Sequence, residues 1–197
     1  MKRLLLLLIL NFTFSQVQYT HPETGISFYQ SSFQHTIYID NVIIDNIDAV
    51  IAEYETEFAP TNNLNELLNP NNPSEADVIF IYYNPSPDMN ICVGWTYYHK
   101  NSLNKTVLKL FGNDFSGNVS NYPTNNTGGN LFSFKIYDAD ANEFGEVDLL
   151  VGNISSPLMP FSHGSSQLVG SLSATNFTEA FHPQTNEELQ IAVDMWV

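Results

Sequence analysis

The chain has 197 residues, of which 21 are acidic and 6 are basic, so its formal net charge is −15. Hydrophobic residues make up 43 % and aromatic residues 13 %, which argues against intrinsic disorder because such a chain can bury enough apolar surface to fold. The single cysteine excludes an intrachain disulfide scaffold. The scarcity of Lys and Arg argues against a nucleic-acid partner, because binding to the phosphate backbone depends on clustered basic side chains.

Residues 1–15 have the pattern of a signal peptide. Lys2 and Arg3 precede an uninterrupted apolar run from Leu4 to Leu10, and the small residues Thr13 and Ser15 are compatible with cleavage before Gln16. The alternative, a membrane-spanning helix, needs about 20 apolar residues, and this run is too short. We therefore expect a secreted or cell-surface protein with no transmembrane span once residues 1–15 are removed. The remaining chain would carry four lysines against 21 acidic residues, a net charge of −17.

From residue 33 onward the hydrophobic pattern has a period of two, which is typical of half-buried strands. Residues 77–83 are apolar at both parities and predict a central strand that is covered on both faces. Only residues 62–68 suggest a helix. Many short strands with turn-forming residues between them predict an all-β fold, an antiparallel β-sandwich of the Ig-like or jelly-roll-like kind with about eight strands. The expected strands are residues 33–40, 47–54, 77–83, 91–98, 105–111, 131–137, 146–151 and 167–172.

Residues 56–76 are polar and rich in Asn and Pro, and they predict one long loop inserted between neighbouring strands. The expected organisation is thus a signal peptide at 1–15, a β-sandwich module at 16–174 and a terminal segment at 175–197. The pattern of this last segment fits a final strand or the start of a truncated following segment, and both interpretations stay open.

Several short blocks occur in a recognisable order. They are the stretch from His21 to Ser32, the Ile91-Cys92-Val93-Gly94-Trp95 strand, the Leu110-Phe111-Gly112-Asn113-Asp114 turn and the Phe134-Lys135-Ile136-Tyr137-Asp138-Ala139 strand. Over residues 20–172 these blocks resemble the repeated all-β extracellular module of large secreted surface proteins of the type IX secretion kind. The resemblance implies an exported all-β fold and supplies no catalytic residues. Ile26 stands where the module usually has Trp, and residues 47–52 replace a strand that usually contains Gly.

One acidic string has the composition of a calcium loop. Asp138, Asp140, Asn142 and Asp148 offer oxygen ligands at close spacing, and Ca²⁺ takes six to eight oxygens. The string departs from the EF-hand pattern, because its sixth and twelfth positions are not the required Gly and Glu. A hairpin turn between residues 132–137 and 146–151 is the simpler interpretation. Calcium is thus a possible ligand, and no other cofactor is expected.

Glu53, Glu55 and Glu57 alternate along an expected strand, where their carboxylates would share one face. Such a ladder could supply the paired carboxylates of a glycoside hydrolase. A solvated strand end explains the pattern more simply. The five histidines show no zinc-binding spacing, and we expect no enzymatic activity.

Aromatic side chains are the other candidate binding groups, since flat rings stack on the apolar faces of sugars. Trp95 shares the parity of the apolar strand residues and is expected in the core, as is Cys92. Tyr83, Tyr98 and Tyr122 are the better candidates for exposure, and they would form the sugar-binding surface in the alternative interpretation as a carbohydrate-binding module.

The sequence thus predicts a secreted, non-enzymatic module with an adhesion or structural role in a larger extracellular protein. The first alternative is a carbohydrate-binding module, and the second is a glycoside hydrolase or a calcium-binding domain. The expected partners are a polysaccharide or another surface protein.

Overall fold

A computed structural model describes residues 16–141 and 149–175 of the protein, and it shows an all-β fold. Twelve strands lie in the described part of the chain, with one short α-helix and two short 3-10 helices. The strands are β1 Gln18–Thr20, β2 Ser27–Tyr29, β3 Gln34–Ile39, β4 Asn41–Ile44, β5 Ile47–Asp48, β6 Val78–Ser86, β7 Met89–Tyr97, β8 Thr106–Phe111, β9 Phe132–Tyr137, β10 Leu149–Ile154, β11 Ser166–Leu168 and β12 Ser171–Ala174. The helices are α1 Leu64–Leu67, η1 Gly117–Val119 and η2 Gly129–Leu131.

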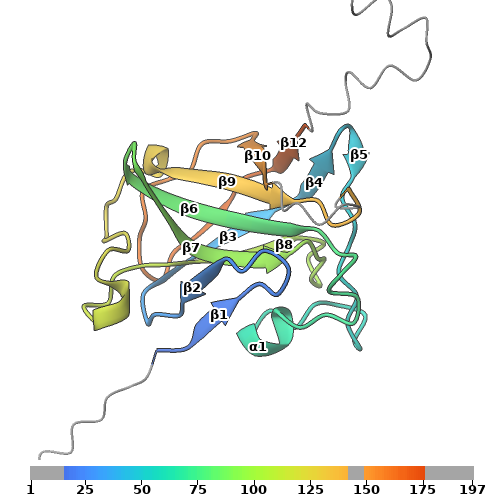
Figure 1. The fold of residues 1–197 in the computed structure, drawn as a ribbon, viewed down its shortest axis with the longest axis horizontal. Coiled ribbons are helices and arrows are strands. Elements are labelled where there is room, and N and C mark those ends of the chain that lie inside the picture. Colours follow the sequence, from blue (N-terminus) through green and yellow to red (C-terminus); the bar gives the residue numbers. More distant parts are fainter. Residues whose placement is uncertain (1–15, 142–148, 176–197) are drawn as a thin grey trace, which may run out of the picture.

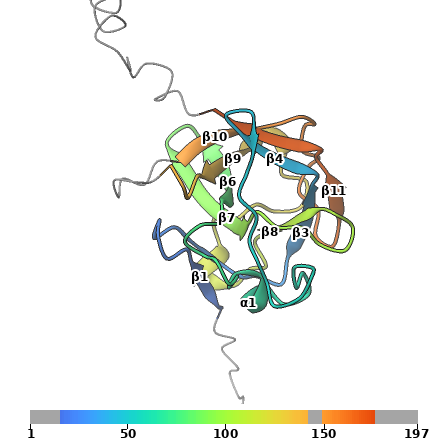
Figure 2. The same cartoon turned by 90° about the vertical axis from the view of Figure 1, so that its right-hand side faces the viewer.

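The strands form a β-sandwich, as the sequence predicts. The larger sheet has seven strands in the order β5-β4-β12-β10-β9-β6-β7, and the smaller has three in the order β11-β3-β8. In Figure 2 these sheets lie around a shared interior, with β1 at one side. β1 and β2 form a separate two-stranded antiparallel sheet. On one side of the sandwich β7 lies very close to β8. A Cβ added at Gly94 would lie only 2.0 Å from the carbonyl oxygen of Lys109.

Two strand pairs are parallel, which differs from the predicted antiparallel arrangement. β11 pairs in parallel with β3, and β12 pairs in parallel with β4. Between β3 and β4, and again between β11 and β12, the chain passes from the smaller sheet to the larger. The two crossings lie side by side, and there the Asp40 N–H donates to the Gly170 carbonyl at 2.7 Å. Gly170 has φ +67°, a conformation that suits glycine. The predicted single strand at 167–172 is therefore divided between two sheets.

Most of the other predicted strands are confirmed, and one is largely wrong. β3, β6, β7, β8 and β9 lie where the period-two patterns place them, and β10 covers the described part of the predicted strand at 146–151, whose first three residues lie outside the described residues. The predicted strand at 47–54 is a strand only at Ile47–Asp48. Beyond it the backbone donates to other segments, for example from Ala52 N–H to the Tyr98 carbonyl at 2.7 Å, so no ladder continues. β1, β2 and β4 were not predicted, because three or four residues are too few to show a period.

The core lies between the sheets and is centred on β6. This strand pairs with β7 on one side and β9 on the other, and its first five residues are buried. The prediction of a doubly covered central strand is thus confirmed. Trp95 and Cys92 are also buried, as expected, and burial raises the pKa of the Cys92 thiol to about 12. A thiol with so high a pKa is inert at neutral pH.

The long loop at 56–76 is present and contains α1, but it joins β5 to β6, which are not neighbours in the sheet. Asn63 caps this helix with a side-chain oxygen that accepts from the Asn65 N–H at 3.1 Å. The Tyr54 hydroxyl donates to the Leu67 carbonyl at 2.7 Å and fastens the helix to the preceding segment. Figure 1 shows α1 beside β1, in agreement with a 2.9 Å hydrogen bond from the Tyr19 hydroxyl to Asn65. Within residues 16–141 and 149–175, no helix has the length and apolar character needed to cross a membrane.

Candidate functional site: an aspartate cluster

Two aspartates meet at one end of the β6–β9 pair. β6 and β9 are antiparallel, with Val78 opposite Tyr137. Asp77 directly precedes Val78, and Asp138 directly follows Tyr137, so the register places both carboxylates at the same edge of the sheet. The ladder thus fixes their proximity.

Asp77 is the most deeply buried member of the site, with only 1 % of its surface exposed. Its two carboxylate oxygens accept hydrogen bonds from the Val50 N–H at 2.6 Å and from the Ala139 N–H at 2.9 Å. These bonds connect the end of β6 to the segment after β5 and to the segment after β9. Asp77 is therefore a rigid group, oriented before any ligand arrives.

Asp140 completes the group, which we call the aspartate cluster: Asp77, Asp138 and Asp140. One carboxylate oxygen from each residue lies within 4.8 Å of the other two. Asp77 is buried, Asp138 is half-buried and Asp140 is exposed, so the cluster runs from the interior to the solvent. The Asp138 carboxylate also accepts from the Ala141 N–H at 3.3 Å, which holds the turn after β9.

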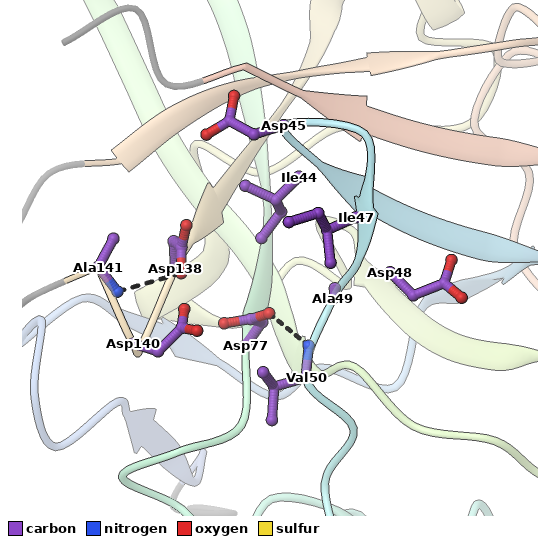
Figure 3. A pocket seen from close by; sticks show the side chains of 10 residues that line it. All are labelled: Ile44, Asp45, Ile47, Asp48, Ala49, Val50, Asp77, Asp138, Asp140 and Ala141. Carbon is purple, nitrogen blue, oxygen red and sulfur yellow. Dashed lines mark hydrogen bonds between the residues drawn. The ribbon is translucent and has the colours of Figure 1, made fainter. Parts of the chain in front are cut away.

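A hollow of about 230 Å³ lies beside the cluster, and five of its ten lining residues are aspartates. Two of these, Asp45 and Asp48, come from the β4–β5 hairpin, and their carboxylates lie apart from the cluster in Figure 3. Asp45 and Asn46 both have positive φ, at 50° and 68°, which is the conformation that a two-residue type I′ turn requires. The turn brings this hairpin over the end of β6. The full lining is Ile44, Asp45, Ile47, Asp48, Ala49, Val50, Asp77, Asp138, Asp140 and Ala141.

The carboxylates of the aspartate cluster raise one another's pKa values. Burial, opposed by the two backbone hydrogen bonds and aided by the charge of Asp140, raises the pKa of Asp77 to about 6. Burial, a hydrogen bond with the Asp140 carboxyl and the charges of both neighbours raise the pKa of Asp138 to about 7. Among the described residues the only ion pair joins Lys105 to Asp40, so no lysine neutralises the cluster. At neutral pH the site therefore needs protons or a cation to relieve its repulsion.

Two of the four predicted calcium ligands, Asp138 and Asp140, lie in this cluster. The other two, Asn142 and Asp148, lie outside the described residues. Asp77 was missed as a ligand candidate, because it belongs to a distant segment and its proximity depends on the β6–β9 register. An acidic residue directly before an apolar strand was its only signal in the sequence.

The predicted exposure of the tyrosines is wrong for two of the three. Tyr98 is 3 % exposed and Tyr122 is 6 % exposed, whereas Tyr83 is half-buried and contacts Phe132. Tyr122 comes from a polar loop, but its hydroxyl turns inward and accepts from the Tyr29 N–H at 2.8 Å. Tyr98 packs in the core beneath Lys100, whose ammonium lies 5.1 Å from the ring centroid. Neither ring is available as an exposed sugar platform in this structure.

The predicted glutamate ladder does not form. Glu53, Glu55 and Glu57 are exposed and lie outside any strand. The segment forms no strand ladder after β5, so there is no sheet face on which the three carboxylates could align. The structure thus does not bring these three carboxylates together on one sheet face.

A scan against protein-family models, a search of curated proteins and a search of solved structures each gave no match.

Proposed function

We propose that the chain is a non-enzymatic module of a secreted or cell-surface protein, with an adhesion or structural role, and that it binds calcium at the aspartate cluster. The observation that carries the calcium site is the approach of three carboxylate oxygens to within 4.8 Å of one another, beside an acidic hollow. The pattern of residues 1–15 and the acidic surface support an extracellular location.

The chemistry of the ligands favours a hard divalent cation. The cluster offers carboxylate oxygens and no nitrogen or sulfur, and such ligands suit Ca²⁺ or Mg²⁺ rather than zinc. Ca²⁺ fits better than Mg²⁺, because it accepts irregular coordination by six to eight oxygens. Mg²⁺ demands a near-ideal octahedron and dehydrates reluctantly.

The position of the cluster gives the ion a structural role. Asp77 lies at the start of β6, and Asp138 and Asp140 lie in the turn after β9, next to the β4–β5 hairpin. An ion bound to all three would tie the start of β6 to the turn after β9. Affinities of about 10⁻⁴ to 10⁻³ M are typical of extracellular calcium modules, and three carboxylates with one exposed member fit that range.

Isothermal titration of CaCl₂ into the purified protein tests the site. We expect binding that is weaker for MgCl₂, and binding that disappears in the double variant Asp138→Asn, Asp140→Asn. Asp88→Asn is the matched control, because Asp88 is exposed in the β6–β7 turn and outside the cluster. At ten times the dissociation constant, calcium should add about 1.4 kcal/mol to the free energy of unfolding.

The proposal fails if 10 mM CaCl₂ produces neither binding heat nor a rise in Tm. It also fails if the double variant binds calcium as well as the Asp88→Asn control does.

A further inference from the structure

Three aromatic rings from separate parts of the chain meet on the surface, and we call Phe33, Phe115 and His163 the aromatic platform. The Phe33 and His163 rings stack with centroids 4.5 Å apart and an interplanar angle of 14°. Phe115 meets Phe33 edge to face, with centroids 6.3 Å apart. Phe115 is 84 % exposed and His163 is also exposed, so much of the aromatic surface faces solvent.

Phe115 occupies a conformation that packing does not explain. Its φ is +65°, in the left-handed region that a bulky residue rarely adopts, although glycine or asparagine would fit there easily. The Asn113 side chain accepts from the Phe115 N–H at 2.7 Å and holds this turn. The chain therefore holds a strained backbone and presents a large apolar ring to water, a combination that clusters at ligand sites.

The His163 ring is also held in place. Its Nδ1 accepts from the Gln34 N–H at 3.2 Å, and the His163 N–H donates to the Asn125 side chain at 2.8 Å. Because Nδ1 accepts, the neutral ring carries its proton on Nε2 and has a donor there. The platform is thus preorganised, which lowers the entropic cost of binding a ligand.

The segments that carry Phe33 and Phe115 also line a hollow of about 420 Å³. This volume lies within the range of about 300 to 1,000 Å³ that is common for small-molecule sites. Val17 is the one apolar side chain among its lining residues, and no lysine or arginine occurs in that described set. The lining is Gln16, Val17, Gln30, Ser31, Ser32, Asp114 and Ser116.

We infer that the aromatic platform and this hollow form a binding site for a neutral glycan. The exposed rings stack on the apolar face of one sugar ring, and the amide, hydroxyl and carboxylate groups of the hollow bind the hydroxyls of the next. Six of the seven residues that line the hollow have polar side chains, which can exchange hydrogen bonds with sugar hydroxyls. The site shares no residue with the aspartate cluster and does not depend on the calcium proposal.

The charge around the hollow selects against acidic sugars. Burial opposes ionisation of Asp114, but hydrogen bonds from Ser116 and Ser32 outweigh it and hold the pKa of that carboxyl below its usual range. Asp114 is therefore an anion at neutral pH, on a chain with a net charge of −15. Uronic-acid polymers are repelled by such a surface.

Affinity electrophoresis in gels containing laminarin, xyloglucan, mannan or alginate tests the inference. We expect at least one of the three neutral polysaccharides to retard the wild-type protein, and alginate to retard it at least tenfold less. Phe115→Gly should weaken binding at least tenfold while folding at least as stably, because glycine relieves the left-handed backbone. Phe58→Ala is the matched control, since Phe58 is also an exposed phenylalanine but lies outside the platform.

The inference is overturned if none of the neutral polysaccharides retards the protein, or if Phe115→Gly binds as well as Phe58→Ala. It is also overturned if Tyr83→Ala alone abolishes binding, which would place the site elsewhere, or if Phe115→Gly abolishes only self-association. Gels run with CaCl₂ and with EDTA separate the two sites: glycan binding that persists in EDTA stands even if calcium binding fails.

Discussion

Asp77 and Asp138 lie next to each other because each directly flanks one member of the paired residues Val78 and Tyr137. The buried carboxylate of Asp77 bonds to the Ala139 N–H, one residue beyond Asp138. This arrangement concentrates negative charge at one end of the β6–β9 ladder. The repulsion among these carboxylates destabilises the calcium-free protein.

Asp138→Asn should stabilise the calcium-free protein. The amide keeps an oxygen that can accept from the Ala141 N–H but removes one of three mutually repelling charges. Asp138 is half-buried and solvent screens part of the repulsion, so we expect a gain of about 1 kcal/mol, or roughly 2–4 °C in Tm. Thermal unfolding in EDTA measures this gain. In CaCl₂ the order should reverse, and an equal rise for Asp88→Asn in EDTA would contradict the explanation.

Gly94→Ala should strongly destabilise the fold. The added Cβ would lie 2.0 Å from the Lys109 carbonyl oxygen, and only movement of the β8 backbone can relieve this clash. We expect a loss of about 3 kcal/mol in the free energy of unfolding, measured by urea denaturation. Gly117→Ala is the control, because a Cβ there meets no atom within 4 Å. Similar losses for both variants would show that β7 and β8 do not approach so closely.

Tyr54→Phe should loosen the long loop without disturbing the sandwich. The Tyr54 hydroxyl donates to the Leu67 carbonyl at the end of α1, and the substitution removes that hydrogen bond alone. A loss of about 1 kcal/mol is expected. Hydrogen exchange should be faster in residues 56–76 and unchanged in β6. Equal acceleration in β6 would mean that the loop and the sheets unfold together.

His99 should make the protein sensitive to acid. Burial lowers the pKa of His99 to about 4, and the Val107 N–H donates to Nε2 at 3.0 Å, which requires the neutral ring. The unfolded state binds a proton at His99 near pH 6.5 while the folded state does not, so the contribution of His99 to stability is lost as pH drops from about 6.5 to about 4, against the opposite effect of the raised pKa values of Asp77 and Asp138. His99 alone should account for about 3 kcal/mol of this loss.

His99→Gln tests this assignment, because glutamine can accept from the Val107 N–H but does not titrate. Urea denaturation at pH 7 and pH 4 should show a smaller difference for the variant than for the wild type. An unchanged difference would assign the acid sensitivity to His21 and His35, whose pKa values burial also lowers.

Phe33 and His163 show what the sequence could not predict about the surface. Phe33 directly precedes β3 and His163 lies shortly before β11, so the parallel pairing of these strands places both rings at the same end of the pair. The period-two pattern identified β3 but held no information about its partner, because alternation reports which face is buried and not which strand lies beside it. The buried positions of Tyr98 and Tyr122 were mispredicted because both residues lie outside the strands, where alternation does not report which side chains are buried.

The sequence by itself determined the all-β class, the central strand at β6, the buried Trp95 and Cys92 and two members of the aspartate cluster. These features depend on alternation, on apolar runs and on neighbours within a few residues, all of which are local. Only the tertiary structure decided that Asp77 joins Asp138 and that Phe115 meets Phe33. Both relationships arise from pairing between strands far apart in the chain, where backbone hydrogen bonds fix a register that side-chain patterns do not encode.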